Sequence, residues 1–122
     1  MDLYSDSILD HYKHPHHSGV LKKYSGRAVE YNPLCGDTIQ ADILMDQKGK
    51  IKDVGFIGSG CAISQAAMSL LSDWLIGKTS SEIQAWNTED MIGLLHVPIS
   101  QGRSTCATLG LAAVKRAVSK KV

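Results

Sequence analysis

The stretch Asp37-Thr-Ile-Gln-Ala-Asp-Ile-Leu-Met45 places apolar side chains at positions 39, 41, 43 and 45. Because successive side chains of a strand point to opposite faces, this period of two predicts a half-buried strand. The turn-forming run Gln47-Lys-Gly-Lys50 follows, and residues 51–57 are suited to a return strand, so we expect a hairpin. Residues 27–31, upstream of this hairpin, form a third candidate strand.

The hydrophobic period changes to that of a helix after residue 57. Apolar residues recur with a 4-3-4 spacing at positions 63, 67, 70 and 74. This spacing predicts a helix from Cys61 to about Ile76, ended by Gly77. Thr79 and Glu82 have the pattern of a capping box, which opens another short helix. That helix is predicted to run to Trp86, and further helices are predicted at residues 3–14, 91–95 and 105–119.

Strands clustered early in the chain and helices clustered late predict an α+β fold. We expect a small antiparallel sheet of about three strands, packed against a set of helices. The 122 residues contain no internal repeat, no low-complexity tract and no long linker. Residues 1–122 are therefore expected to form a single domain with one modest core.

Composition narrows the function classes. Apolar residues make up 43% of the chain, charged residues 20%, and the formal net charge is +1. This balance argues against a dedicated nucleic-acid binder, which carries a strong basic excess. No apolar run approaches the roughly 18–20 residues of a membrane span. The first residues lack the basic and apolar regions of a signal peptide, so a cytoplasmic location is expected.

The chain has three cysteines, an odd number that a closed disulfide framework cannot use completely. In a reducing cytosol, functional thiols usually serve metals or catalysis. Cys35 lies among turn-forming residues, two positions before Asp37, whose carboxylate could bind the same metal. Cys61 follows a glycine-rich turn and is predicted to open the long helix. Cys106 is predicted to open the last helix.

Helix N-termini stabilise thiolates, which are the nucleophilic and metal-binding form of cysteine. A buried structural role is the alternative for each cysteine taken alone. The spacing is not that of a compact zinc knuckle, so the ligands would have to converge from three distant loops. We therefore predict a metal site at one end of the molecule.

Six further residues have two interpretations each. Arg103 lies three positions before Cys106 and is either a cation supporting a thiolate or an anionic cluster, or a surface arginine. His96 is either a helix-end residue or an additional metal ligand that reaches the cysteine cluster. The remaining histidines either form a second metal site or belong to a loop after the first helix; they are His11, His14, His16 and His17.

Three segments resemble the signature segments of the IscU/SufU/NifU-N family of iron–sulfur cluster assembly scaffolds. They are Asn32-Pro-Leu-Cys-Gly-Asp37, Gly58-Ser-Gly-Cys-Ala-Ile-Ser-Gln65 and Arg103-Ser-Thr-Cys-Ala-Thr-Leu109. The opening Leu3-Tyr-Ser-Asp-Ser-Ile-Leu-Asp-His-Tyr12 is also similar to the first helix of that family. The resemblance extends over nearly the whole chain.

This resemblance implies a scaffold rather than a turnover enzyme. Its sulfur would come from a pyridoxal-phosphate cysteine desulfurase and arrive as persulfide on Cys106 or Cys35. A transient [2Fe–2S] cluster would form on Cys35, Asp37, Cys61 and Cys106, and would pass to apo-proteins. Arg103 would give electrostatic support, and zinc is the metal expected in the isolated protein.

Departures from the family pattern keep alternatives open. The housekeeping branch has a histidine where this chain has Thr105, so the fourth ligand is assigned to Asp37. Residues 99–103 lack the prolines that a specialised Hsp70-type chaperone recognises in that branch, so the resemblance leaves this partner an open question. Arg103 resembles the SufU branch, although the insertion typical of that branch is absent. A zinc-dependent sulfurtransferase that relays persulfide is therefore the alternative, and a zinc-stabilised interaction module is a third.

Overall fold

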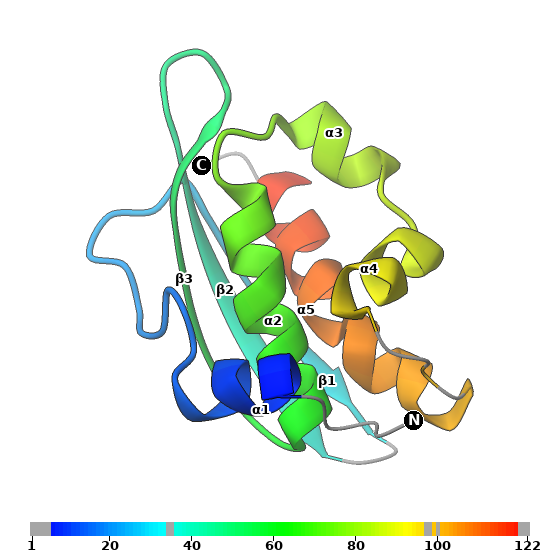
Figure 1. Ribbon diagram of the computed structural model, residues 1–122. Coiled ribbons are helices and arrows are strands. Elements are labelled where there is room, and N and C mark those ends of the chain that lie inside the picture. Colours follow the sequence, from blue (N-terminus) through cyan, green and yellow to red (C-terminus); the bar gives the residue numbers. More distant parts are fainter. Residues whose placement is uncertain (1–5, 34–35, 97–98, 100, 120–122) are drawn as a thin grey trace.

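The computed structural model describes residues 6–33, 36–96, 99 and 101–119, and the side chains of all of these except residues 101 and 102. Three strands and five helices lie within these ranges (Figure 1). In chain order they are α1 (Asp6–Lys13), β1 (Gly26–Asn32), β2 (Asp37–Met45), β3 (Ile51–Ser59), α2 (Ala62–Leu75), α3 (Ser80–Ala85), α4 (Thr88–Leu95) and α5 (Gln101–Ser119).

The strands form one antiparallel sheet in the order β1-β2-β3. Ala41 of the central strand pairs with Ala28 of β1 and with Phe56 of β3, so the predicted hairpin is confirmed. β2 has the predicted bounds, whereas β3 continues beyond the predicted residue 57 to Ser59. This extension carries β3 to the end of the sheet at which β2 begins.

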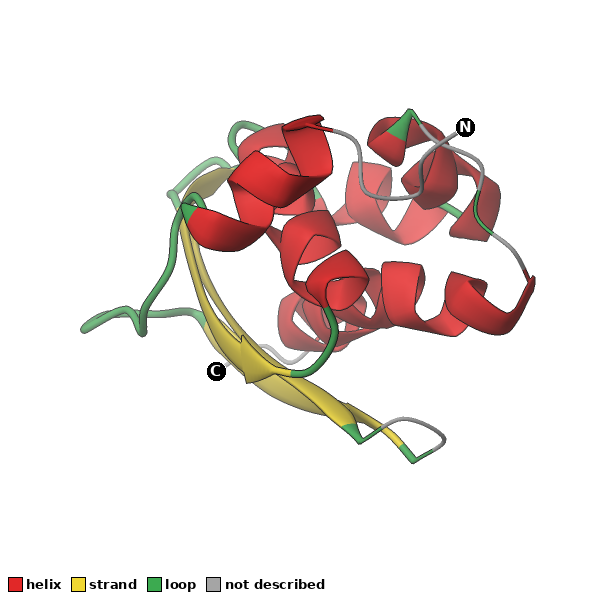
Figure 2. Cartoon of the chain, turned by 60° about the horizontal axis from the view of Figure 1, so that its bottom comes forward, coloured by secondary structure: helices red, strands yellow, loops and turns green. Residues whose placement is uncertain are grey.

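All the helices lie on one face of the sheet (Figure 2), and the predicted α+β class is confirmed. Helix α5 packs across β1 and β2, α2 lies against α5 and β3, and α1 lies against α2. Fully buried side chains such as Ile39, Ile43, Leu71 and Val114 fill the space between the layers. None of the described helices is long and apolar enough to cross a membrane.

The helix boundaries differ from prediction at two places. Helix α5 begins at Gln101 rather than near Thr105, because a glycine in the first turn costs only about 1 kcal/mol, which packing against the sheet overcomes. Cys106 therefore lies inside the helix and not at its N-terminus. Helix α4 begins at Thr88, three residues earlier than predicted, since Asn87 forms a second capping box.

Helix α1 buries a different side from the predicted one. Ile8 is buried as expected, but Tyr12 is 44% exposed and His11 is buried instead. The cause is a polar contact: His11 Nδ1 lies 2.7 Å from Ser69 Oγ on α2. The loop that follows α1 is also held on α2, because the backbone N–H of His16 donates to the same hydroxyl.

Candidate metal centre

Asp37 is the first residue of β2 and pairs with Asn32, the last residue of β1. Its side chain is 1% exposed although it is an acid. One carboxylate oxygen accepts the backbone N–H of Cys61 at 3.1 Å, and the other lies 3.4 Å from Cys61 Sγ. The start of the central strand thus delivers a buried carboxylate to the turn between β3 and α2.

Cys61 is the N-cap residue of α2 and is half-buried. Here the prediction of a cysteine at a helix N-terminus is correct. The turn before it depends on Gly60, which has a φ of +139°. A Cβ atom at this position would lie 2.1 Å from Asp37 Oδ1, so no other residue allows the backbone to pass this close to the carboxylate.

Cys106 lies in the second turn of α5 and is 6% exposed. The prediction that this thiol sits at a helix N-terminus is wrong, so the helix dipole, which acts within the first turn, does not act on it directly. Asn32 compensates in part, because its side-chain amide points a donor at Cys106 Sγ across 3.9 Å. Cys106 approaches the other two residues from the helix layer, whereas Asp37 comes from the sheet.

One ligand atom from each of Asp37, Cys61 and Cys106 lies within 4.8 Å of the others. Zinc–sulfur bonds of about 2.3 Å place tetrahedral ligands roughly 3.7 Å apart, so small side-chain rotations would close this set around an ion. The fourth predicted ligand, Cys35, lies outside the described residues. Asp37 and Cys106 are buried, so these two members of the group are enclosed by the fold.

Three neighbours of this group were not among the residues predicted from sequence. Asn32, predicted only as part of a turn, is 3% exposed and contacts Cys106. Ser64 is fully buried, and its Oγ lies 3.9 Å from Cys61 Sγ. Gly60 makes room for the Asp37 carboxylate. The Asn-Pro and Gly-Ser-Gly turns were the available signals, but a turn signal alone does not report which side chains it brings together.

The two remaining candidates are placed differently. Arg103 is half-buried in the first turn of α5, three residues before Cys106. Residues three apart lie on the same side of a helix, which keeps the proposed electrostatic role open. His96 is the C-cap of α4 with a φ of +58°, as the helix-end interpretation predicts. It does not belong to the group of ligand atoms around Cys61.

The donor set suits a thiolate-binding metal. Thiolates select zinc and iron–sulfur clusters, and a carboxylate is a harder ligand that zinc also accepts. A carboxylate buried beside two thiols is an arrangement that a cation stabilises, because burying a charge without compensation is costly. One end of the sheet and the helices α2 and α5 bring these side chains together. This arrangement is typical of a metal-binding domain.

The family follows from comparison with known proteins. The chain matches the model of the NifU-like N terminal domain over residues 3–121, and it belongs to that family. The iron–sulfur cluster assembly scaffold protein IscU of Streptococcus pyogenes serotype M1 is 41% identical over 83 residues, which are 68% of this chain and 51% of that protein.

Two further proteins match at nearly full length. The scaffold protein IscU of Haemophilus influenzae is 32% identical over 119 residues, covering 95% of this chain and 93% of that protein. A solved structure of a proposed iron–sulfur cluster assembly scaffold for the SUF system of Fervidobacterium islandicum AW-1 superposes with a TM-score of 0.75. It is 27% identical and covers 94% of this chain and 96% of that one. These matches confirm the resemblance inferred from the three cysteine segments.

Proposed function

We propose that this protein is a scaffold for iron–sulfur cluster assembly. The observation that carries the proposal is the convergence of Asp37, Cys61 and Cys106 within 4.8 Å, in a chain of this family. Relatives that match nearly the whole chain are named as scaffold proteins of this kind. Iron and sulfide are the substrates of such a protein, and a [2Fe–2S] cluster is its cargo.

Four side chains hold the cluster in this proposal: Cys35, Asp37, Cys61 and Cys106. Cys35 is two residues from Asp37, so chain geometry limits the distance between their Cα atoms to about 7 Å. Three thiolates and one carboxylate form a weaker set than four thiolates, because carboxylate oxygen matches iron–sulfur chemistry less well. A cluster held in this way is suited to transfer to an apo-acceptor.

Sulfur would arrive from a cysteine desulfurase as persulfide. A thiolate of the scaffold attacks the outer sulfur of the desulfurase persulfide, the sulfur–sulfur bond breaks, and the desulfurase thiolate leaves. A two-electron reductant must then release sulfide from the new persulfide. Cys106 is 6% exposed, so its use as acceptor requires the start of α5 to move, which favours Cys35 as the first acceptor.

A zinc-dependent sulfurtransferase is the second candidate. It is favoured by Arg103, which lies one helical turn before Cys106, where a fixed cation can stabilise a thiolate. In this function zinc would be resident on the same ligands and would activate one thiolate toward persulfide. The donor set of sulfur and carboxylate fits zinc as well as iron.

Anaerobic reconstitution distinguishes the two functions. The protein is incubated with ferrous iron, cysteine, a reductant and a cysteine desulfurase, and visible absorption is recorded. A scaffold develops the chromophore of a [2Fe–2S] cluster, and the Cys61→Ser variant does not. Sulfur transfer to the protein without any chromophore would support the sulfurtransferase and reject the scaffold. Absence of both would reject the site.

A further inference from the structure

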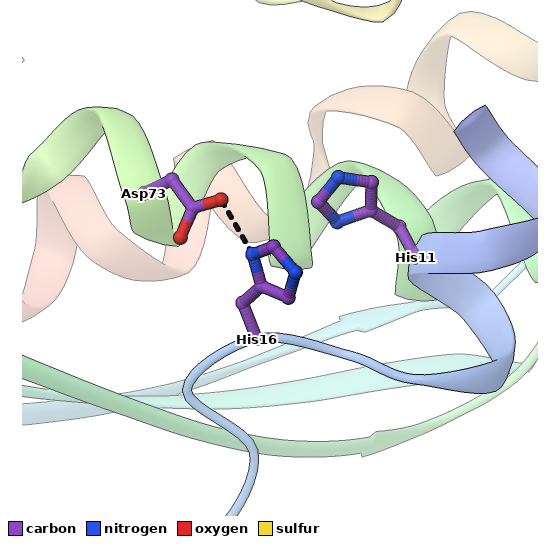
Figure 3. Close-up of side chains that lie close together, drawn as sticks. All are labelled: His11, His16 and Asp73. Atoms are coloured by element: carbon purple, nitrogen blue, oxygen red, sulfur yellow. Dashed lines mark hydrogen bonds and ion pairs between the residues drawn. The ribbon is translucent and has the colours of Figure 1, made fainter.

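A second group of candidate ligands lies beside helix α2 and contains no cysteine. His11 from α1, His16 from the following loop and Asp73 from α2 each place one ligand atom within 4.8 Å of the others (Figure 3). His16 Nδ1 lies 2.6 Å from Asp73 Oδ2. The rings of His11 and His16 are 4.5 Å apart between centroids and tilted by 51°. Three separate segments thus contribute two imidazoles and one carboxylate.

The surroundings orient these side chains. Ser69 Oγ lies 2.7 Å from His11 Nδ1 and accepts the backbone N–H of His16. His17 Nδ1 lies 3.5 Å from the other oxygen of Asp73 and 2.9 Å from Ser72 Oγ. An imidazole that is held through one ring nitrogen keeps its other nitrogen for a metal ion, and this is the usual arrangement of a histidine ligand.

Charge and exposure also suit a cation. The group contains one carboxylate, and imidazole in its neutral form offers a lone pair to a metal ion. The side chains of His16 and Asp73 are 47% and 45% exposed, so an ion can reach them from solvent.

We propose that His11, His16 and Asp73 form a binding site for a divalent first-row transition ion of the zinc type. Imidazole nitrogen and carboxylate oxygen are ligands for zinc, iron, cobalt, nickel and copper. Tetrahedral ligands at about 2.0–2.1 Å lie roughly 3.4 Å apart, so the exposed His16 and Asp73 need only small rotations to meet one ion with His11. The remaining coordination positions are open to water.

This site is distinct from the cysteine centre in place and in chemistry. Asp73 is twelve positions beyond Cys61 in the sequence, which is roughly 18 Å along the axis of a helix. The group of His11, His16 and Asp73 contains no sulfur ligand, so it is not a site for an iron–sulfur cluster. A bound ion would cross-link α1 and its following loop to α2, and would stabilise the folded state in proportion to its affinity.

Binding of cobalt(II) can be measured separately for the two sites in one sample. Thiolate-bound cobalt has a sulfur-to-metal charge-transfer band, and cobalt on nitrogen and oxygen ligands has none. Total bound cobalt is measured by equilibrium dialysis of the whole chain at neutral pH. We expect total bound cobalt to exceed thiolate-bound cobalt by one ion per chain, and zinc to displace that ion.

Three variants test the assignment. His16→Ala removes one ligand, and Asp73→Asn removes a charge while keeping a hydrogen-bond acceptor for His16. Both should weaken the second site by about tenfold or more without changing the charge-transfer band. His14→Ala is the matched control, since His14 is exposed and lies outside the group, and it should leave binding unchanged.

Either of two results would overturn the proposal. One is total bound cobalt that equals thiolate-bound cobalt. The other is a second ion that survives in His16→Ala and Asp73→Asn, or that is lost equally in His14→Ala. Far-UV circular dichroism of each variant checks that the fold is retained. Thiolate-bound cobalt is measured separately by its charge-transfer band. A negative result for the second metal site is therefore distinguishable from a failure of the proposed scaffold function.

Discussion

At the scale of single residues, Asp37 connects the sheet to the cysteines through both of its oxygens. If it is the fourth cluster ligand, Asp37→Ala should lengthen the life of a reconstituted cluster in air and slow its transfer to an apo-acceptor. The reason is that an added thiol can fill the vacancy with sulfur, which binds iron–sulfur clusters more firmly than a carboxylate. Visible absorption during exposure to air measures this lifetime.

The same variant tests the zinc function. There Asp37→Ala should lower zinc affinity by roughly tenfold or more and impair sulfur relay. Asp53→Ala, an exposed acid on β3, is the control and should alter neither quantity. Unchanged cluster lifetime together with unchanged zinc retention in Asp37→Ala would remove Asp37 from the ligand set.

Gly60 offers a second test at this scale. Gly60→Ala combines an unfavourable φ of +139° with a Cβ atom 2.1 Å from Asp37 Oδ1. Gly49→Ala also faces a positive φ, of +80°, but this lies nearer the left-handed region that other residues can adopt, and no atom lies within 4 Å. We expect Gly49→Ala to cost about 1 kcal/mol of unfolding free energy and Gly60→Ala about 1–3 kcal/mol more. Only Gly60→Ala should also weaken zinc binding. Urea unfolding and zinc titration measure the two effects, and equal losses would show that the carboxylate has room to move.

Arg103 is tested by its effect on sulfur acceptance. Arg103→Ala should slow persulfide transfer or docking of the desulfurase and leave the fold intact, because a fixed cation near a thiolate stabilises the anion. Arg116→Ala, at the opposite end of α5, is the matched control. Labelled sulfur bound per chain after incubation with desulfurase gives the rate. Equal rates in wild type and Arg103→Ala would make Arg103 a surface residue.

At the scale of elements, α3 is defined by its capping box. Thr79 Oγ1 accepts the backbone N–H of Glu82, and the Glu82 carboxylate accepts the backbone N–H of Thr79. Those hydrogen bonds from Thr79 hold the pKa of Glu82 below its ordinary value. The folded state therefore binds this proton more weakly than the unfolded state does. The resulting stability is complete above a pH of about 4.5 and is lost as the pH falls below that value.

Two variants of this capping box should change stability in different ways. Thr79→Ala should lower the unfolding free energy by about 1 kcal/mol at neutral pH, whereas Ser81→Ala, exposed in the same helix, should be nearly neutral. Glu82→Gln keeps a capping side chain but does not titrate. It should therefore flatten the fall in stability between neutral and acid pH, as measured by urea unfolding. An unchanged pH profile would mean that the Glu82 contact does not persist in solution.

At the scale of the whole molecule, most of the core lies outside the candidate metal centre, although Cys106 belongs to the core and Cys61 packs against it. The largest fully buried side chains come from the inner face of the sheet and from the helices, for example Ile43, Leu75 and Ile83. We therefore expect the chelated protein to keep its far-UV circular dichroism and to unfold cooperatively in urea, at a lower midpoint than the metal-bound form. A chelated chain without a cooperative transition would instead identify a zinc-stabilised module.

The sequence alone predicted what depends on neighbouring residues. The period of two in residues 37–45 predicted the central strand, and the capping box at Thr79 predicted the start of α3. Where signals were weak, boundaries moved, as at Gln101, because packing on the sheet outweighs the small penalty of one glycine. The three cysteine segments indicated the family, and the match to the family model confirmed it.

Only the tertiary structure decided which side chains share a site. Asn32 meets Cys106 across 74 positions of sequence, and His16 meets Asp73 across 57. No local pattern contains such contacts, because they arise when helices settle on the sheet and on one another. The same packing buried His11 in place of Tyr12, through a hydroxyl on a different helix. Periodicity determines which face of a helix is apolar, whereas the partner that covers that face is determined by the fold.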